Sequence, residues 1–183
     1  MFEVFTPVDH EFANDDFGVD QYPEVLSKNE VGALDLFSRG LSLDGIAAQL
    51  YVAPNTVRHY IRTVHVKYGV TSTAHATRVA IERGDLSFTE DIEAERSLSE
   101  VEFKSLELAS LGFTAVEAAI ARNVSVNTLR THNRTIKTKL QARTIVEAVR
   151  RGFELGYFNY PVKDSGVSAL SVMALMSSLD KIN

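Results

Sequence analysis

The chain has 183 residues, of which 45% are hydrophobic, enough for one ordinary domain or two small ones with packed cores. It has no cysteine, which excludes disulfides and thiolate metal sites and fits a reducing cytosol. No apolar run approaches the length of a membrane span, and the first residues lack the cationic and apolar regions of a signal peptide. We therefore expect a soluble, cytoplasmic protein with no membrane partner.

The net charge of −5 conceals an uneven distribution of charge along the chain. Residues 1–25 hold seven acids and no Lys or Arg, and removing those seven charges from the total leaves +2 for the rest. Residues 54–67 contain three basic residues and no acid, and residues 122–151 contain eight basic residues against Glu147 alone. Because the acidity is segregated from two basic stretches, the net charge does not exclude a nucleic acid as the partner.

An internal repeat organises the chain. Shifted by 72 residues, positions 26–86 align with 98–158 without a gap and share 19 identities over 61 positions. Two copies of one fold explain such a match. The predicted organisation is an acidic N-terminal segment (1–25), a first domain (26–86), an acidic linker (87–97), a second domain (98–158) and a C-terminal tail with an apolar helix (159–183).

Each copy of the repeat predicts four short helices. A Ser-x-x-Glu capping box predicts that the first helix begins after Ser27 or Ser99, and Gly40 or Gly112 ends it. The remaining helices are predicted at 43–50 or 115–122, at about 54–68 or 126–140, and at 72–83 or 144–155. The fold class is therefore predicted to be all-α.

Three motifs stand at matching places in the two copies. Both copies open with Leu-Ser-x-x-Glu, and the first continues with Gly-Leu-Ser-Leu-Asp-Gly-Ile-Ala over residues 40–47. The third predicted helices carry Asn-Thr-Val-Arg-His (55–59) and Asn-Thr-Leu-Arg-Thr-His (127–132), followed by Lys67 and Lys139. These motifs resemble the LuxR/FixJ/NarL-type helix-turn-helix of bacterial transcription regulators over about two-thirds of the chain. The resemblance implies two tandem four-helix helix-turn-helix domains joined by a short acidic linker, in a bacterial or phage-encoded, nucleoid-associated protein.

The resemblance also implies which side chains contact double-stranded DNA. The major groove of B-DNA admits one α-helix, and residues near the start of that helix reach the base edges. Carried over from the family, the predicted base contacts are Arg58, His59, Arg62, Arg130, Thr131 and Arg134. The predicted phosphate contacts are Asn55, Thr56, Thr63, Lys67, Asn127, Thr128, Thr135 and Lys139. The implied function is transcriptional control, by repression, since no activation domain or sensor is recognisable.

The linker and the two third helices bear on how one chain would use both domains. Fully extended, the linker 87–97 reaches about 36 Å, and one turn of DNA is about 34 Å, so one chain can reach successive turns. The alternative is that the linker extends a helix. The two helices differ at His59 and Thr131, which suits an asymmetric site. The second copy has Ala118 and Arg122 where the family has Ile and Leu. We expect its second helix to pack less well, or Ile120 to take over part of the contact.

Other functions find less support in the sequence. The five histidines show no metal-ligand spacing with nearby acids, and there is no glycine-rich phosphate loop or nucleophile elbow, so we expect no enzyme, metal or cofactor. An alternative is a protein-interaction module that binds polymerase, a sigma factor or another regulator. The apolar stripe at 166–182 either completes the core of the second copy or forms a homodimer. The acidic segment 1–25 is either a solvated tail or packs on a basic helix.

Overall fold

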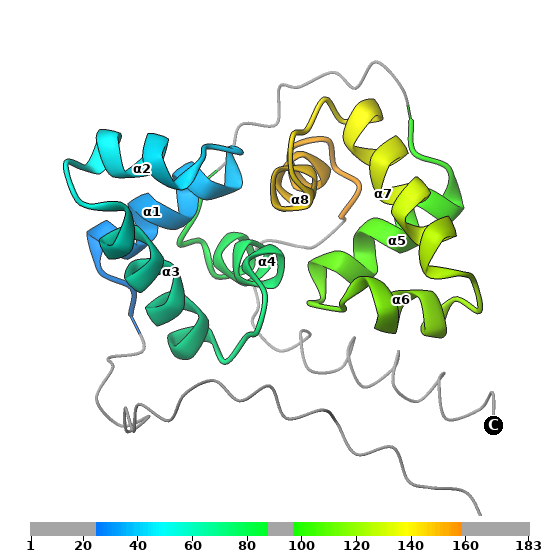
Figure 1. Cartoon of the computed structure of the whole chain (residues 1–183), viewed down its shortest axis with the longest axis horizontal. Coiled ribbons are helices and arrows are strands. Elements are labelled where there is room, and N and C mark those ends of the chain that lie inside the picture. Colours follow the sequence, from blue (N-terminus) through cyan, green and yellow to red (C-terminus); the bar gives the residue numbers. More distant parts are fainter. Residues whose placement is uncertain (1–24, 88–96, 159–183) are drawn as a thin grey trace, which may run out of the picture.

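The computed structural model describes residues 25–87 and 97–158, which form eight α-helices and no strand (Figure 1). For this part of the chain the prediction of an all-α protein is confirmed, and the helix bounds lie within about two residues of those expected. The first four helices are α1 (Lys28–Ser38), α2 (Leu43–Leu50), α3 (Pro54–Tyr68) and α4 (Thr73–Arg83). The last four are α5 (Glu100–Ser110), α6 (Ala115–Ala121), α7 (Val126–Lys139) and α8 (Ile145–Glu154). None of these helices is long and apolar enough to cross a membrane.

Local hydrogen bonds determine where the helices begin. Ser27 and Ser99 form the expected capping boxes, in which each serine hydroxyl accepts from the backbone amide of the glutamate three residues later. That glutamate carboxylate in turn accepts from the serine backbone amide, at 2.6 Å for Ser27 and 2.7 Å for Ser99. Pro54 occupies the first turn of α3, where its missing amide costs no intrahelical bond. Gly40 and Gly112 follow α1 and α5 with φ of 79° and 92°, a backbone conformation that glycine adopts without strain.

The capping-box glutamates also join the first and third helix of each group. Lys67 Nζ donates to Glu30 Oε2 at 2.7 Å, and Lys139 Nζ donates to Glu102 Oε2 at 2.7 Å. Burial raises the pKa of each glutamate, but the hydrogen bonds from the lysine and from the capping serine outweigh it. The net result is a pKa below the ordinary value of both Glu30 and Glu102, so each carboxylate is held charged in the folded protein.

The two glutamates should make the stability of the chain depend on acid. Because their pKa values are lower in the folded state, the unfolded chain takes up protons first as the pH falls below the ordinary value of 4.5. We expect the urea midpoint to fall as the pH drops from that value through the lowered pKa values. The double variant Glu30→Gln, Glu102→Gln should be less stable at neutral pH. Its urea midpoint should also fall less steeply with pH below 4.5. If the urea midpoint of the variant fell as steeply with pH as that of the wild type, the two glutamates would not be the source of the acid sensitivity.

The two groups of four helices pack directly against each other. α4 lies against α8, and the flanking contacts are reciprocal, with α1 on α8 and α5 on α4 (Figure 1). One continuous core spans both groups, including Leu34 and Ala80 from the first and Leu106 and Val149 from the second. Residues 88–96 of the predicted linker lie outside the described part of the chain, so the structure does not decide between an extended linker and a helix extension. In the structure this helical interface fixes the distance, because both groups share one core.

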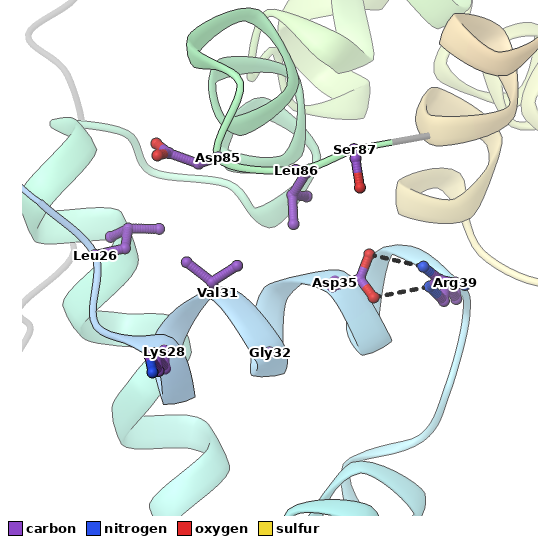
Figure 2. A pocket seen from close by; sticks show the side chains of 9 residues that line it. All are labelled: Leu26, Lys28, Val31, Gly32, Asp35, Arg39, Asp85, Leu86 and Ser87. Atoms are coloured by element: carbon purple, nitrogen blue, oxygen red, sulfur yellow. Dashed lines mark hydrogen bonds and ion pairs between the residues drawn. The ribbon is translucent and has the colours of Figure 1, made fainter. Parts of the chain in front are cut away.

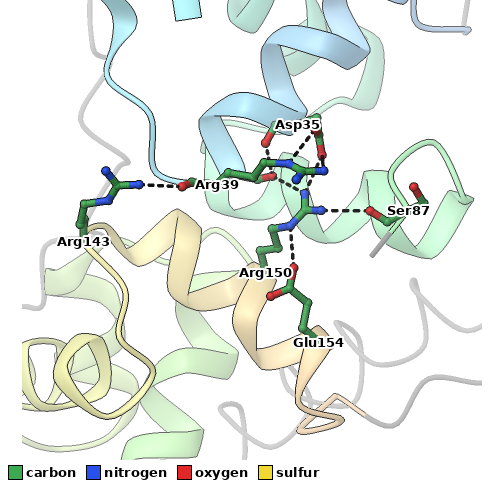
Figure 3. Close-up of polar contacts among 7 residues, drawn as sticks. Asp35, Arg39, Ser87, Arg143, Arg150 and Glu154 are labelled. Carbon is green, nitrogen blue, oxygen red and sulfur yellow. Dashed lines mark hydrogen bonds and ion pairs between the residues drawn. The ribbon is translucent and has the colours of Figure 1, made fainter. Parts of the chain in front are cut away.

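Two buried arginines cross this interface at equivalent positions of the sequence repeat. Arg150 of α8 donates from Nη1 to Asp35 Oδ1 of α1 at 2.7 Å (Figure 3). The same nitrogen donates to Ser38 Oγ of α1 at 2.8 Å. Arg78 of α4 donates from Nη1 to Ser110 Oγ of α5 at 3.0 Å. The two contacts are therefore reciprocal, because each arginine binds the serine at the equivalent position of the other group, as in an isologous interface.

Helix α6 has fewer core contacts than α2, its counterpart in the first group. Ala118 stands at the position of Ile46 and belongs to a small buried cluster separate from the main core. Ile120 is 75% exposed, so the expectation that it takes over part of the contact is wrong. Arg122 compensates with polar bonds to α5, donating to the carbonyl of Val101 at 2.6 Å and to Ser105 Oγ. The small separate cluster around Ala118 agrees with the expectation that this helix packs less well.

Candidate nucleic-acid interface

Helix α3 has an apolar side in the core and a basic side facing outwards. The buried residues on its inner side include Val57, Ile61 and Val64. The three residues predicted to contact bases, Arg58, His59 and Arg62, are all exposed. Arg58 Nη1 donates to Asn55 Oδ1 at 2.6 Å, and among the described residues neither arginine forms an ion pair. Both positive charges are therefore available to an anion.

Helix α7 presents the equivalent surface in the second group of helices. Its inner side is held in the protein by Leu129 and Ile136, both buried. The three residues predicted to contact bases there, Arg130, Thr131 and Arg134, are exposed. Arg130 Nη1 donates to Asn127 Oδ1 at 3.4 Å, the same asparagine–arginine pairing as in α3. Two helices at equivalent places thus each offer two exposed guanidinium groups.

The predicted phosphate contacts at the starts of α3 and α7 are accessible. Asn55, Asn127 and Thr128 are exposed, and Thr56 is half-buried. They lie in the first turns, where backbone amides without intrahelical partners favour anions. Thr135 is half-buried further along α7, and its hydroxyl donates to the carbonyl of Thr131 at 3.1 Å.

Three other predicted phosphate contacts do not fit the structure. The side chain of Thr63 is in the core, with 4% of the residue exposed. The ammonium groups of Lys67 and Lys139 are bound to Glu30 and Glu102, and the Lys67 side chain is only 4% exposed. The sequence spacing does not reveal these ion pairs because the partners are 37 residues apart and meet only after the helices pack. We therefore leave these three residues out of the interface.

Comparison with known proteins finds a similarity for the first group of helices. Residues 24–80 match the family model of bacterial regulatory proteins, luxR family. Residues 24–80 are thus similar to the domain of this luxR family. The match spans α1 to α3 and most of α4, and so it includes Arg58, His59 and Arg62. It does not extend to residues 98–158.

The chain is also similar to curated proteins over part of its length. Two proteins called "Probable transcriptional regulatory protein NarL", from Mycobacterium tuberculosis strains CDC 1551 / Oshkosh and ATCC 25618 / H37Rv, are each 40% identical over 57 residues. The match covers 31% of this chain and 26% of each relative. The chain thus spans about a quarter of the length of these relatives. No solved structure gives a significant match.

Sequence reasoning missed the residues that join the first group of helices to the second. Arg78 and Arg150 received no role, although their identity at equivalent positions of the repeat was a signal. An arginine inside a helix is most often a solvated side chain, and only packing shows that these two are buried. The family model ends close to Arg78, and Arg150 lies beyond it.

A pocket of about 420 Å³, lined by no residue of α3, lies between α1 and the residues that follow α4 (Figure 2). It opens to solvent and has a mixed lining that includes Val31, Asp35 and Asp85. Both carboxylates have partners, since Asp35 is ion-paired with Arg39 at 2.8 Å and Asp85 accepts from Tyr68 at 2.7 Å. Among the described residues no group of three or more histidines and acids is placed to hold a metal ion. These features leave the basic surfaces of α3 and α7 as the candidate site.

Proposed function

We propose that this chain binds double-stranded DNA through α3 and α7 and thereby regulates transcription. The observation that carries the proposal is the pair of helices at equivalent positions, each apolar inside and each exposing two arginines. Arginine recognises guanine bidentately in the major groove, which admits one helix. The luxR-family match supports this role for α3. For α7, the same role is supported by the sequence repeat and by the glutamate–lysine ion pair that both groups of helices contain. On these grounds we propose that residues 98–158 are a second copy of the domain.

The interface between the two groups supports binding by one chain at a bipartite site. Helix-turn-helix dimers read two half-sites because a two-fold axis relates their recognition helices. Here contacts between α4 and α8 join the two groups within one polypeptide, and these contacts are reciprocal. Since α3 carries His59 where α7 carries Thr131, we propose that the two half-sites differ in sequence. We propose repression by occupancy as the mode of regulation.

Selection of DNA from a random library with the full chain, followed by a salt titration of the best site, tests this proposal. We expect one bipartite site to be enriched. The logarithm of the binding constant should fall with the logarithm of salt concentration with a slope of about −0.9 per phosphate neutralised. Failure to enrich any sequence, together with no affinity at low salt, would reject DNA binding.

One observation favours the alternative of a protein-interaction module. Val116 and Ile120 lie one turn apart on α6 and are 55% and 75% exposed, whereas the equivalent residues of α2 are Asp44 and Ala48. An apolar helix face of this kind is a common feature of protein contacts. Association with polymerase, a sigma factor or another regulator, lost in the variant Val116→Asp, Ile120→Ala, would support this function.

A further inference from the structure

We propose that the acidic residues 1–24 bind the basic face of α3 in the same chain and mask it from DNA. The masking of DNA rests on the proposed function, whereas the contact within the chain does not. Residues 1–24 contain seven acids and no Lys or Arg. The face they would cover is formed by Arg58, His59 and Arg62, all exposed.

The first described residue lies directly beside α3. The carbonyl of Val25 accepts a hydrogen bond from Lys67 Nζ at 3.2 Å, and the same ammonium is held by Glu30 at 2.7 Å. Residues 1–24 therefore join the folded part at the C-terminal end of α3. At about 1.5 Å of rise per residue, Arg62 and Arg58 lie roughly 8 and 14 Å along the helix from Lys67.

The length of residues 1–24 is ample for this contact. Twenty-four residues at about 3.3 Å each reach roughly 80 Å, several times the length of α3. A tethered segment also has a high effective concentration at its neighbour, in the millimolar range for short tethers. Weak pairs between exposed charges can therefore be populated within the chain, although the same pairs would be negligible between separate molecules.

The second group of helices repeats the arrangement. The carbonyl of Ser97 accepts from Lys139 Nζ at 3.2 Å, and Lys139 is held by Glu102 as Lys67 is by Glu30. Residues 88–96 precede it and contain four acids against one arginine. An acidic segment thus enters the fold at the same end of α3 and of α7. Because the acidic charge and the point of entry recur in both copies, the arrangement at residues 1–24 is not an isolated feature.

A spin label measures the contact without DNA. The chain has no cysteine, so Asn14→Cys gives a single attachment site and keeps all seven acids. At low salt we expect the label to broaden amide signals of Arg58 and Arg62 more than those of α8. The broadening should disappear at high salt, because these pairs are screened, and in the variant Arg58→Gln, Arg62→Gln. Equal broadening of α3 and α8 would overturn the proposal.

DNA affinity measures the masking in the chain that includes residues 1–24. In one variant all seven acids of residues 1–24 are replaced by their amides, and in a matched control the same residues are kept in scrambled order. We expect the amide variant to bind DNA about three- to tenfold more tightly at low salt, with no difference at high salt, and the control to behave as the wild type. Unchanged affinity in the amide variant would overturn the masking. If the chain binds no DNA at all, the proposed function fails and the spin label alone decides the contact.

Discussion

Replacing Arg150 by alanine is expected to lower the free energy of unfolding by about 3–5 kcal/mol. Arg150 is 5% exposed and makes charged contacts to Asp35 at 2.7 Å and to Glu154 at 2.8 Å. It also donates to the carbonyl of Ser87 at 3.0 Å (Figure 3). The alanine variant would leave the Glu154 carboxylate, whose side chain is 9% exposed, buried without its partner. The cost of an unpaired buried charge explains the size of the effect.

Urea denaturation of the full chain measures this effect, and Arg39→Ala is the matched control. Arg39 pairs with the same Asp35 at 2.8 Å, but its side chain is 54% exposed, so we expect a loss of at most about 1 kcal/mol. Arg150→Lys should fall between them, because lysine keeps the charge and loses the planar fork. If Arg150→Ala were no more destabilising than Arg39→Ala, the arginine would not be an essential part of the interface between the two groups.

Replacing Arg58 and Arg130 by alanine is expected to abolish most of the sequence-specific affinity for DNA. A good bidentate contact between arginine and guanine contributes about 1–3 kcal/mol of discrimination. The affinity of each single variant for the selected site should therefore fall roughly five- to 150-fold. The two residues lie on separate helices with no shared partner, so the losses in the double variant should add. Arg39→Ala removes the same charge from a position outside both helices and should have a far smaller effect.

The pattern of the loss distinguishes base contacts from phosphate contacts. If the arginine contacts a base, its variant should lose affinity only for the selected site. The variant should also tolerate any base at one position of that site. An equal loss on non-specific DNA, with a smaller salt slope, would reassign the arginine to a phosphate. Binding titrations of each variant with the selected site and with an unrelated duplex, at two salt concentrations, make the comparison.

Local chemistry in the sequence was enough to predict the helices and the outward faces of α3 and α7. The capping bonds of Ser27 and Ser99 join residues three apart, so the bounds of α1 and α5 follow from short stretches of chain. The helical spacing of buried Val57, Ile61 and Val64 places Arg58 and Arg62 on the outer side of α3. Such features depend on near neighbours, and the sequence displays near neighbours directly.

The packing of the helices decided which polar residues remain available. Lys67 has the residue type and spacing of a phosphate contact, yet Glu30 binds it from 37 positions away. Arg150 has the character of a surface residue in the sequence, yet it is bound to Ser38, 112 positions away, across the interface. Partners at such separations are brought together only when α1 packs on α3 and α8, because periodicity describes the face of one helix and not the helix that covers it.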